Sequence, residues 1–223
     1  MIFRLETSEI IALVLTLLLS LSLHEWAHAG AAYIMGDNTA KQQNRLSLNP
    51  LNHIDLFGFL AILLVGFGWA KPVQIDIRNF RHPVRGEIFV SLAGPFSNLL
   101  LASLLLAGSL RGWFPYTLPL EFLGIPGIPN IPVGPMLDLV IHLNLVLFIF
   151  NMLPIPPLDG SHLVTALIPK HMEQTKRSFQ RYGQFSLLAI LLLSAVFNYR
   201  LLPISSLTRQ LINFLVPLLS PHS

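Results

Sequence analysis

The 223-residue sequence contains no cysteine and few charged residues. The absence of cysteine excludes disulfide bonds, thiolate metal ligands and a cysteine nucleophile. Asp, Glu, Lys and Arg make up 11% of the chain, against about 25% in soluble globular domains. Since 53% of the residues are hydrophobic, a water-soluble fold would expose large apolar areas, which soluble monomers rarely do. The composition therefore excludes a soluble globule and indicates a membrane protein.

The small positive charge does not indicate a nucleic-acid-binding protein. The net charge is +3, but the basic residues are few and are separated by long apolar runs. Lys and Arg beside membrane spans have a simpler explanation, because they set the orientation of the spans. We expect a single domain over residues 1–223 that is embedded in the lipid bilayer and has no nucleic-acid partner.

Apolar runs that could cross a bilayer occur along most of the chain. A hydrocarbon core of about 30 Å requires about 20 helical residues. The apolar runs lie at residues 10–35, 88–110, 136–153, 185–197 and 204–219. They predict an all-α polytopic membrane protein with about four to five transmembrane helices. The first run also resembles a signal peptide, but the preceding charges, Arg4, Glu6 and Glu9, are not the positive region that a signal peptide carries.

The segment at residues 56–78 differs from the other apolar runs. Its first part is short for a straight span and contains Gly58, Gly66 and Gly68. Apolar and polar residues alternate from Val73 to Arg78, which is the period of a β-strand. We therefore expect a re-entrant or strand-like segment near residues 56–78, which could offer an edge to an extended substrate.

Lys and Arg are concentrated in two connections between the apolar runs. Residues 41–85 and 170–181 contain ten of the 14 basic residues, whereas residues 112–135 contain none. Short cytoplasmic loops are enriched in Lys and Arg, so both basic connections are predicted to be cytoplasmic. Gly36 and Pro154 then lie at the same, cytoplasmic, face of a multi-pass protein of the cell membrane.

Residues His24-Glu25-Trp26-Ala27-His28 fit the pattern H-E-x-x-H. On a helix the two imidazoles lie on one face and can hold a zinc ion, and Glu25 can act as general base on a water that zinc activates. Charged groups inside a membrane helix cost about 2.5 to 3.5 kcal/mol each, so these residues predict a function. The alternative is a polar cluster that neighbouring helices satisfy.

A catalytic zinc usually has three protein ligands and one open position, so a third ligand is required. Asp159 follows a predicted span that ends on the same membrane face as His28. Pro154, Pro156 and Pro157 prevent the helix from continuing there, and Gly160 allows a turn. Asp159 is therefore a candidate third ligand. The alternative is that Asp159 only caps the helix that starts near Gly160.

Four ordered motifs resemble those of the site-2 proteases, which are intramembrane zinc metalloproteases. They are HEWAH at 24–28, FGWAKPV at 67–73, LAGPFSN at 92–98 and NMLPIPPLDG at 151–160. The resemblance implies that His24, His28 and Asp159 ligate one zinc ion per chain and that Glu25 is the general base. It also implies that Asn151 lies at the active site and helps to hold the substrate or the oxyanion. Gly94, Pro95 and Asn98 match a motif to which we assign a structural role.

The expected function is hydrolysis of peptide bonds in single-span transmembrane protein substrates, with the active site toward the cytoplasmic side. The chain resembles a minimal form of the family without PDZ or CBS domains. One alternative is a membrane metal transporter in which His24, His28 and Asp159 line an ion path. Another is a catalytically silent membrane scaffold, which predicts an incomplete set of zinc ligands.

Overall fold

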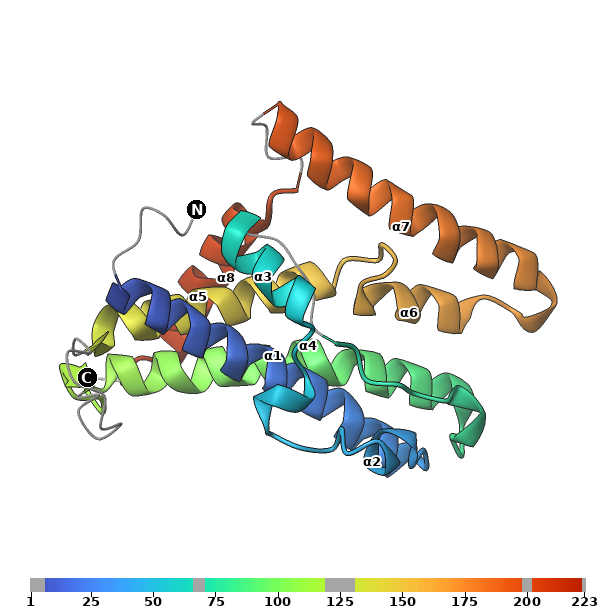
Figure 1. The fold of residues 1–223 in the computed structure, drawn as a ribbon, viewed down its shortest axis with the longest axis horizontal. Coiled ribbons are helices and arrows are strands. Elements are labelled where there is room, and N and C mark those ends of the chain that lie inside the picture. Colours follow the sequence, from blue (N-terminus) through green and yellow to red (C-terminus); the bar gives the residue numbers. More distant parts are fainter. Residues whose placement is uncertain (1–6, 66–70, 119–130, 198–201, 222–223) are drawn as a thin grey trace.

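The computed structural model describes residues 7–65, 71–118, 131–197 and 202–221. The three longest apolar helices are α1 (Thr7–Met35), α4 (Pro83–Leu110) and α5 (Val133–Asn151). Among the described residues, these three are long and apolar enough to cross a membrane. α4 runs in the opposite direction to α1 and α5 (Figure 1). The expected all-helical membrane architecture is therefore confirmed, while the expected number of four to five transmembrane helices stays a prediction.

The core of this bundle combines a few large apolar residues with small and polar residues, which are typical between membrane helices. α4 packs on both α1 and α5, and the side chains buried between them include Ala102, Leu145, Asn98 and Asn144. Large apolar side chains on the same helices, such as Leu100 and Leu104, are exposed. In a bilayer those side chains contact lipid.

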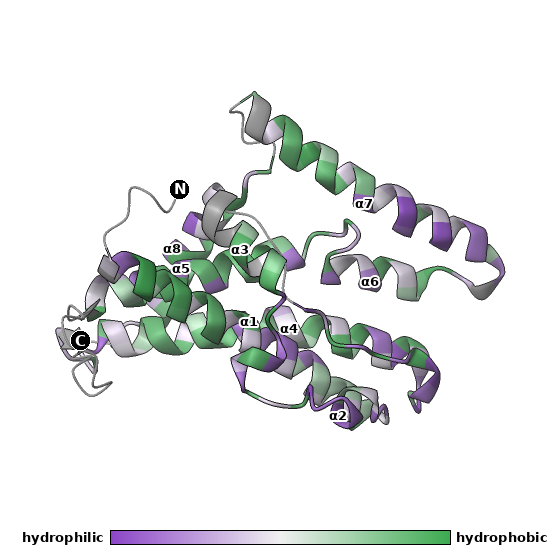
Figure 2. Ribbon diagram, viewed as in Figure 1, coloured by the Kyte–Doolittle hydropathy of each residue, from purple (hydrophilic) through white to green (hydrophobic). Residues whose placement is uncertain are grey.

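Hydrophilic residues are gathered at one end of the molecule (Figure 2). They cover the start of α4, the first half of α7 (Glu173–Val196) and the short helix α2 (Thr39–Gln42). The opposite halves of α1, α4 and α5 are predominantly apolar. The bundle thus has one polar end, and this end carries the basic connections.

The segment at residues 56–78 differs from the expected strand. Helix α3 covers Leu56–Val65, and the Asp55 carboxylate accepts the Gly58 N–H at 2.8 Å as an N-cap. Residues 66–70 lie outside the described residues. From 71 to 76 the described chain has no paired strand, and η3 (Ile77–Asn79) follows. A helix satisfies its own backbone hydrogen bonds, which an unpaired strand in an apolar environment does not. A re-entrant placement of this segment stays a prediction.

The remaining elements lie at both ends and along one side of the bundle. They are η2 (Pro50–Asn52), the two-residue strands β1 (Thr117–Leu118) and β2 (Ile131–Pro132), α6 (Asp159–Leu167), η5 (Lys170–Met172) and α8 (Ile204–Leu219). β1 and β2 pair antiparallel. α8 packs on α5 and α4, while α7 stands apart from the three long helices (Figure 1).

Candidate active site

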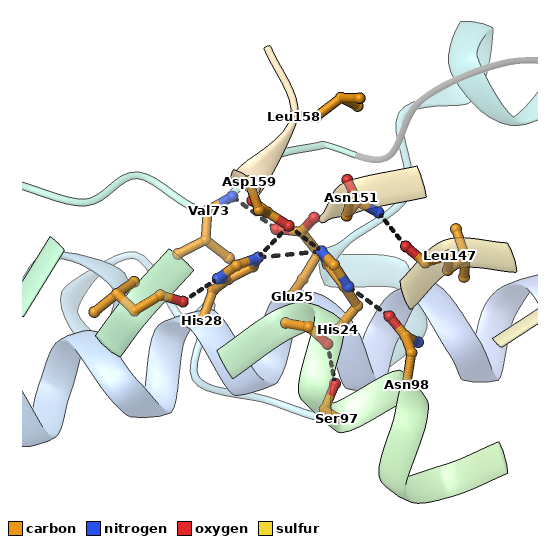
Figure 3. Close-up of polar contacts among 12 residues, drawn as sticks. His24, Glu25, His28, Val73, Ser97, Asn98, Leu147, Asn151, Leu158 and Asp159 are labelled. Carbon is orange, nitrogen blue, oxygen red and sulfur yellow. Dashed lines mark hydrogen bonds and ion pairs between the residues drawn. The ribbon is translucent and has the colours of Figure 1, made fainter. Parts of the chain in front are cut away.

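The H-E-x-x-H residues lie on α1, more than halfway along the helix. His24 and His28 are one helical turn apart, and each is only 7% exposed. Their ring centroids are 4.7 Å apart. Because residues at i and i+4 lie on one face of a helix, both imidazoles point to the same side of α1, as Figure 3 shows. Glu25 is half-buried beside them.

Asp159 reaches the same point from a break in the chain. α5 ends at Asn151, and the proline-rich turn that follows leads into α6, whose first residue is Asp159. Gly160 packs so tightly against this turn that an added Cβ would lie 2.6 Å from the Leu153 carbonyl oxygen. Only glycine fits there, so the tight turn places Asp159 at the start of α6 and directs it toward α1.

The three predicted ligand atoms form a nearly equilateral triangle. His24 Nε2 and His28 Nε2 are 3.1 Å apart, and Asp159 Oδ2 lies 3.2 Å from the first and 3.3 Å from the second. In a tetrahedral zinc site, bonds of 2.0–2.2 Å separate neighbouring ligand atoms by about 3.4 Å. The observed triangle has almost this size, so the donor set fits a zinc ion.

The hydrogen bonds of the imidazoles show which nitrogens carry protons. His28 Nδ1 lies 2.8 Å from the Val90 carbonyl oxygen, and a carbonyl can only accept. The proton of neutral His28 is therefore on Nδ1, which leaves the Nε2 lone pair directed toward Asp159. Asp159 Oδ2 is buried and accepts no hydrogen bond from the described residues. Converging lone pairs of this kind form a donor set that suits a cation.

Asn98 fixes His24 in the same tautomer. The Asn98 Nδ2 group lies 3.2 Å from the Ser20 carbonyl oxygen, which can only accept, so the amide orientation is determined. Asn98 Oδ1 then faces His24 Nδ1 at 2.6 Å and accepts its proton. Asn98 is fully buried, and it therefore holds the His24 ring in the orientation that metal binding needs.

Asn144 on α5 extends this network. Its Nδ2 group donates to the Val140 carbonyl oxygen and to Ser20 Oγ, both at 2.8 Å. Its Oδ1 accepts from Asn98 Nδ2 at 2.7 Å. The polar residues of α1, α4 and α5 thus form one connected and fully buried network behind His24.

The glycine of the LAGPFSN motif, Gly94, lies against the two imidazoles. A Cβ at this position would overlap His28 Nε2 and would lie 2.8 Å from His24 Cε1. The absence of a side chain allows α4 to pack directly against both imidazoles. Gly94 and Asn98 are one helical turn apart, so both face the site.

Glu25 is held by the extended segment before α4. The Val73 N–H donates to Glu25 Oε2 at 3.0 Å. Glu25 Oε1 accepts no hydrogen bond from the described residues. One carboxylate oxygen is therefore fixed by the backbone, and the other is available to a water or a substrate.

Asn151 lies near these groups, and among the described residues it makes no hydrogen bond to them. Figure 3 shows it at the end of α5, next to Asp159, and its Nδ2 group donates to the Leu147 carbonyl oxygen at 3.0 Å. The structure thus brings together His24, His28 and Asp159 with Glu25 adjacent, and it leaves Asn151 bonded to its own helix. The direct contact of Asn98 with His24 was not predicted, although the Gly94-to-Asn98 spacing of one turn was visible in the sequence.

Comparison with known proteins identifies the family. Residues 127–194, which include Asn151 and Asp159, match Peptidase family M50. The protein named "Putative zinc metalloprotease YwhC" from Bacillus subtilis (strain 168) is 40% identical over 200 residues, which cover 89% of this chain and 87% of the relative. The chain belongs to peptidase family M50, the site-2 proteases. The resemblance seen in the four motifs is confirmed.

More distant M50 relatives are longer than this chain. "Putative zinc metalloprotease Rip2" from Mycobacterium tuberculosis (strain ATCC 25618 / H37Rv) is 32% identical over 180 residues, which cover 79% of this chain and 63% of the relative. The protein of the same name from Mycolicibacterium smegmatis is 31% identical over 184 residues, with the same two shares. No solved structure matches this M50 chain.

Proposed function

We propose that this M50 peptidase is an intramembrane zinc endopeptidase in which His24, His28 and Asp159 hold one zinc ion and Glu25 is the general base. Its class, a membrane zinc metalloprotease, follows from its family and its apolar helices. The observation that carries the residue assignment is the triangle of three ligand atoms, 3.1–3.3 Å on each side, with a carboxylate beside it. The whole chain, residues 1–223, acts as one membrane-embedded protease domain.

When held by His24, His28 and Asp159, a zinc ion would supply Lewis-acid chemistry, which polarises a carbonyl and makes a water more acidic. Glu25 Oε1 accepts a proton from the attacking water. Meanwhile the Val73 N–H holds Glu25 Oε2 in place with a hydrogen bond of 3.0 Å. Glu25 then delivers this proton to the nitrogen of the leaving amine. A fixed carboxylate performs both transfers without losing its orientation.

Asn151 binds the substrate and does not ligate the metal. One N–H of its side-chain amide is bonded to the Leu147 carbonyl, and the second N–H is available to a carbonyl oxygen of the substrate. A neutral donor beside the reacting carbonyl stabilises the negative charge that develops on oxygen. Asn151 therefore contributes to the oxyanion site.

Single-span transmembrane proteins are the substrate class that fits this location. The site lies among helices whose outer side chains are apolar, and it is close to the polar end of the molecule. The basic connections at residues 41–85 and 170–181 belong to that end, which orients it toward the cytoplasm. Water from the cytoplasm then has a short path to the reacting bond.

Replacing the third ligand tests the assignment of the metal site. Asp159→Ala removes the ligand on α6, and we expect bound zinc to fall well below one per chain and peptide cleavage to be lost. Asp138→Ala changes an exposed carboxylate on α5 and serves as the matched control. Zinc is measured by elemental analysis of the purified proteins and cleavage with a transmembrane peptide in detergent. Full zinc content in Asp159→Ala would contradict the assignment.

A further inference from the structure

A second buried carboxylate, Glu87, lies at the polar end of α4 and takes no part in the chemistry proposed above. It is 7% exposed. Its Oε1 lies 3.2 Å from Thr165 Oγ1 and 3.4 Å from His162 Nδ1, both on α6. The Thr165 hydroxyl is also 3.2 Å from the His162 carbonyl oxygen, so its one proton is shared between Glu87 and its own helix. Lys176 Nζ on α7 is 3.8 Å from the same oxygen. Three helices therefore meet at one carboxylate.

This cluster is not built as a second metal site. Glu87 and His162 are ligand types, but the Lys176 ammonium group is close to the oxygen that a cation would need. A bound cation would be repelled by that charge. The contacts instead join α4 to α6 and α7, so they bear on where these helices lie.

The position of α6 matters because its first residue is Asp159. The helix has nine residues, too few to be stable without tertiary contacts. Gly160 anchors its start against the turn after α5. Thr165, 1% exposed, anchors its second half to Glu87, about 9 Å along the helix from Asp159. Without the second anchor, α6 could pivot about the turn and displace the Asp159 carboxylate.

The helix that carries Glu87 also supports both histidines. The Val90 carbonyl accepts from His28, Gly94 packs on both rings, and Asn98 accepts from His24. Counted from Glu87, these residues lie three, seven and eleven positions further along α4, which places all of them on one face of the helix. One face of α4 thus contacts every element that supplies a predicted zinc ligand.

We propose that Glu87 is a positioning residue for Asp159: through the Thr165 hydroxyl it holds α6 on α4, so that the third zinc ligand meets the two histidines. This inference rests on the proposed zinc site. A buried charge of this kind adds little to stability and can instead specify geometry. Loss of the Glu87–Thr165 bond should therefore be detected in zinc affinity.

The test measures zinc dissociation constants of the full chain in detergent by competition with a chelator. Thr165→Val keeps the side-chain shape but removes the hydroxyl, and we expect zinc binding to weaken about tenfold, as for other outer partners of metal ligands. Thr165→Ser retains the hydroxyl and should bind zinc like the wild type. Glu87→Ala should lower zinc affinity about as much as Thr165→Val does. The double variant should bind zinc as tightly as the single variant with the lower affinity. Glu173→Ala, an exposed carboxylate on α7, is the control.

The outcomes separate this inference from the proposed function. Wild-type affinity in Thr165→Val, together with loss of zinc in His24→Ala, would overturn the role of Glu87 and leave the zinc site intact. Wild-type affinity in His24→Ala would overturn the zinc site and this inference with it. If Glu87→Ala does not fold, the comparison of Thr165→Val with Thr165→Ser still decides the question.

Discussion

At the scale of single residues, the site depends on the absence of a side chain at Gly94. The two imidazoles occupy the space where a Cβ would be. A methyl group there would force α4 away from α1 or turn the His28 ring. Either movement would also lengthen the contacts of Val90 with His28 and of Asn98 with His24, which are now 2.8 Å and 2.6 Å.

Gly94→Ala should therefore abolish stoichiometric zinc binding. Gly134→Ala on α5 is the matched control, since an added Cβ there has no neighbour within 4 Å, and it should bind zinc normally. Elemental analysis of both purified variants measures the difference. Equal zinc content in the two variants would show that α4 does not need to pack against the imidazoles.

At the scale of secondary-structure elements, the limits of the apolar helices were predictable from the sequence, whereas those of polar helical segments were not. The last apolar run was predicted at 204–219, and α8 has these limits. α7 was predicted only from residue 185, yet it begins at Glu173, because its first half is polar and carries no apolar signal. The segment at 56–65 contains helix-compatible residues that are also common in strands, so local sequence could not decide between them.

The side-chain positions that build the site were predictable only in part. The H-E-x-x-H spacing places His24 and His28 on one helical face by geometry alone. The contact of Asn98 with His24 and the approach of Gly94 to both rings depend on how α4 crosses α1, which no local pattern determines. The same holds for Glu87, whose partners lie more than 70 residues away in sequence.

Asp37 joins the end of α1 to the segment before α4. The buried carboxylate accepts from Thr39 Oγ1 at 2.6 Å and Asn79 Nδ2 at 2.8 Å through Oδ1, and from the Asp76 N–H at 2.8 Å through Oδ2. Burial alone would raise the pKa of Asp37, but these donors outweigh it and hold the pKa below its usual value. Since the same segment carries Val73, Asp37 also supports the contact with Glu25.

The lowered pKa gives the stabilisation by Asp37 a defined pH dependence. It is fully present above the unfolded-state pKa of about 3.9 and is lost as pH falls through the lower folded-state pKa. Asp37→Asn should therefore lower the unfolding temperature in detergent at pH 7, with a smaller difference from the wild type below about pH 4. Thermal unfolding across this range measures it. A difference that stays constant with pH would contradict the role of the ionised carboxylate.

At the scale of the whole molecule, the absence of cysteine allows the orientation to be tested directly. Gln42 lies at the polar end and Ser109 near the opposite end of α4, and both are exposed. In the variant Gln42→Cys, a charged, membrane-impermeant thiol reagent should label the protein only from the cytoplasmic side. In Ser109→Cys it should label only from the outside. The reverse pattern in intact cells and inverted vesicles would contradict a cytoplasmic active site.

The low charge content has a functional consequence for the molecule as a whole. Only 11% of the residues are charged. Among the described residues, the buried ionisable side chains are those of the proposed metal site, Glu87, Asp37 and His53, and His53 hydrogen-bonds the Ser47 carbonyl. Each such group costs free energy in an apolar environment. Of these groups, His24, His28 and Glu87 lie on or against one face of α4, whereas Asp37 and His53 hold the connections around it.

The most direct test compares the wild type with Glu25→Gln for bound zinc and for cleavage of transmembrane peptides in detergent. The amide keeps the shape of the carboxylate and can still accept the Val73 N–H, but it cannot take a proton from water. Both proteins should hold one zinc ion per chain, and only the wild type should cleave. A metal transporter would keep its transport activity in this variant. Equal cleavage by the two proteins would contradict the proposed mechanism.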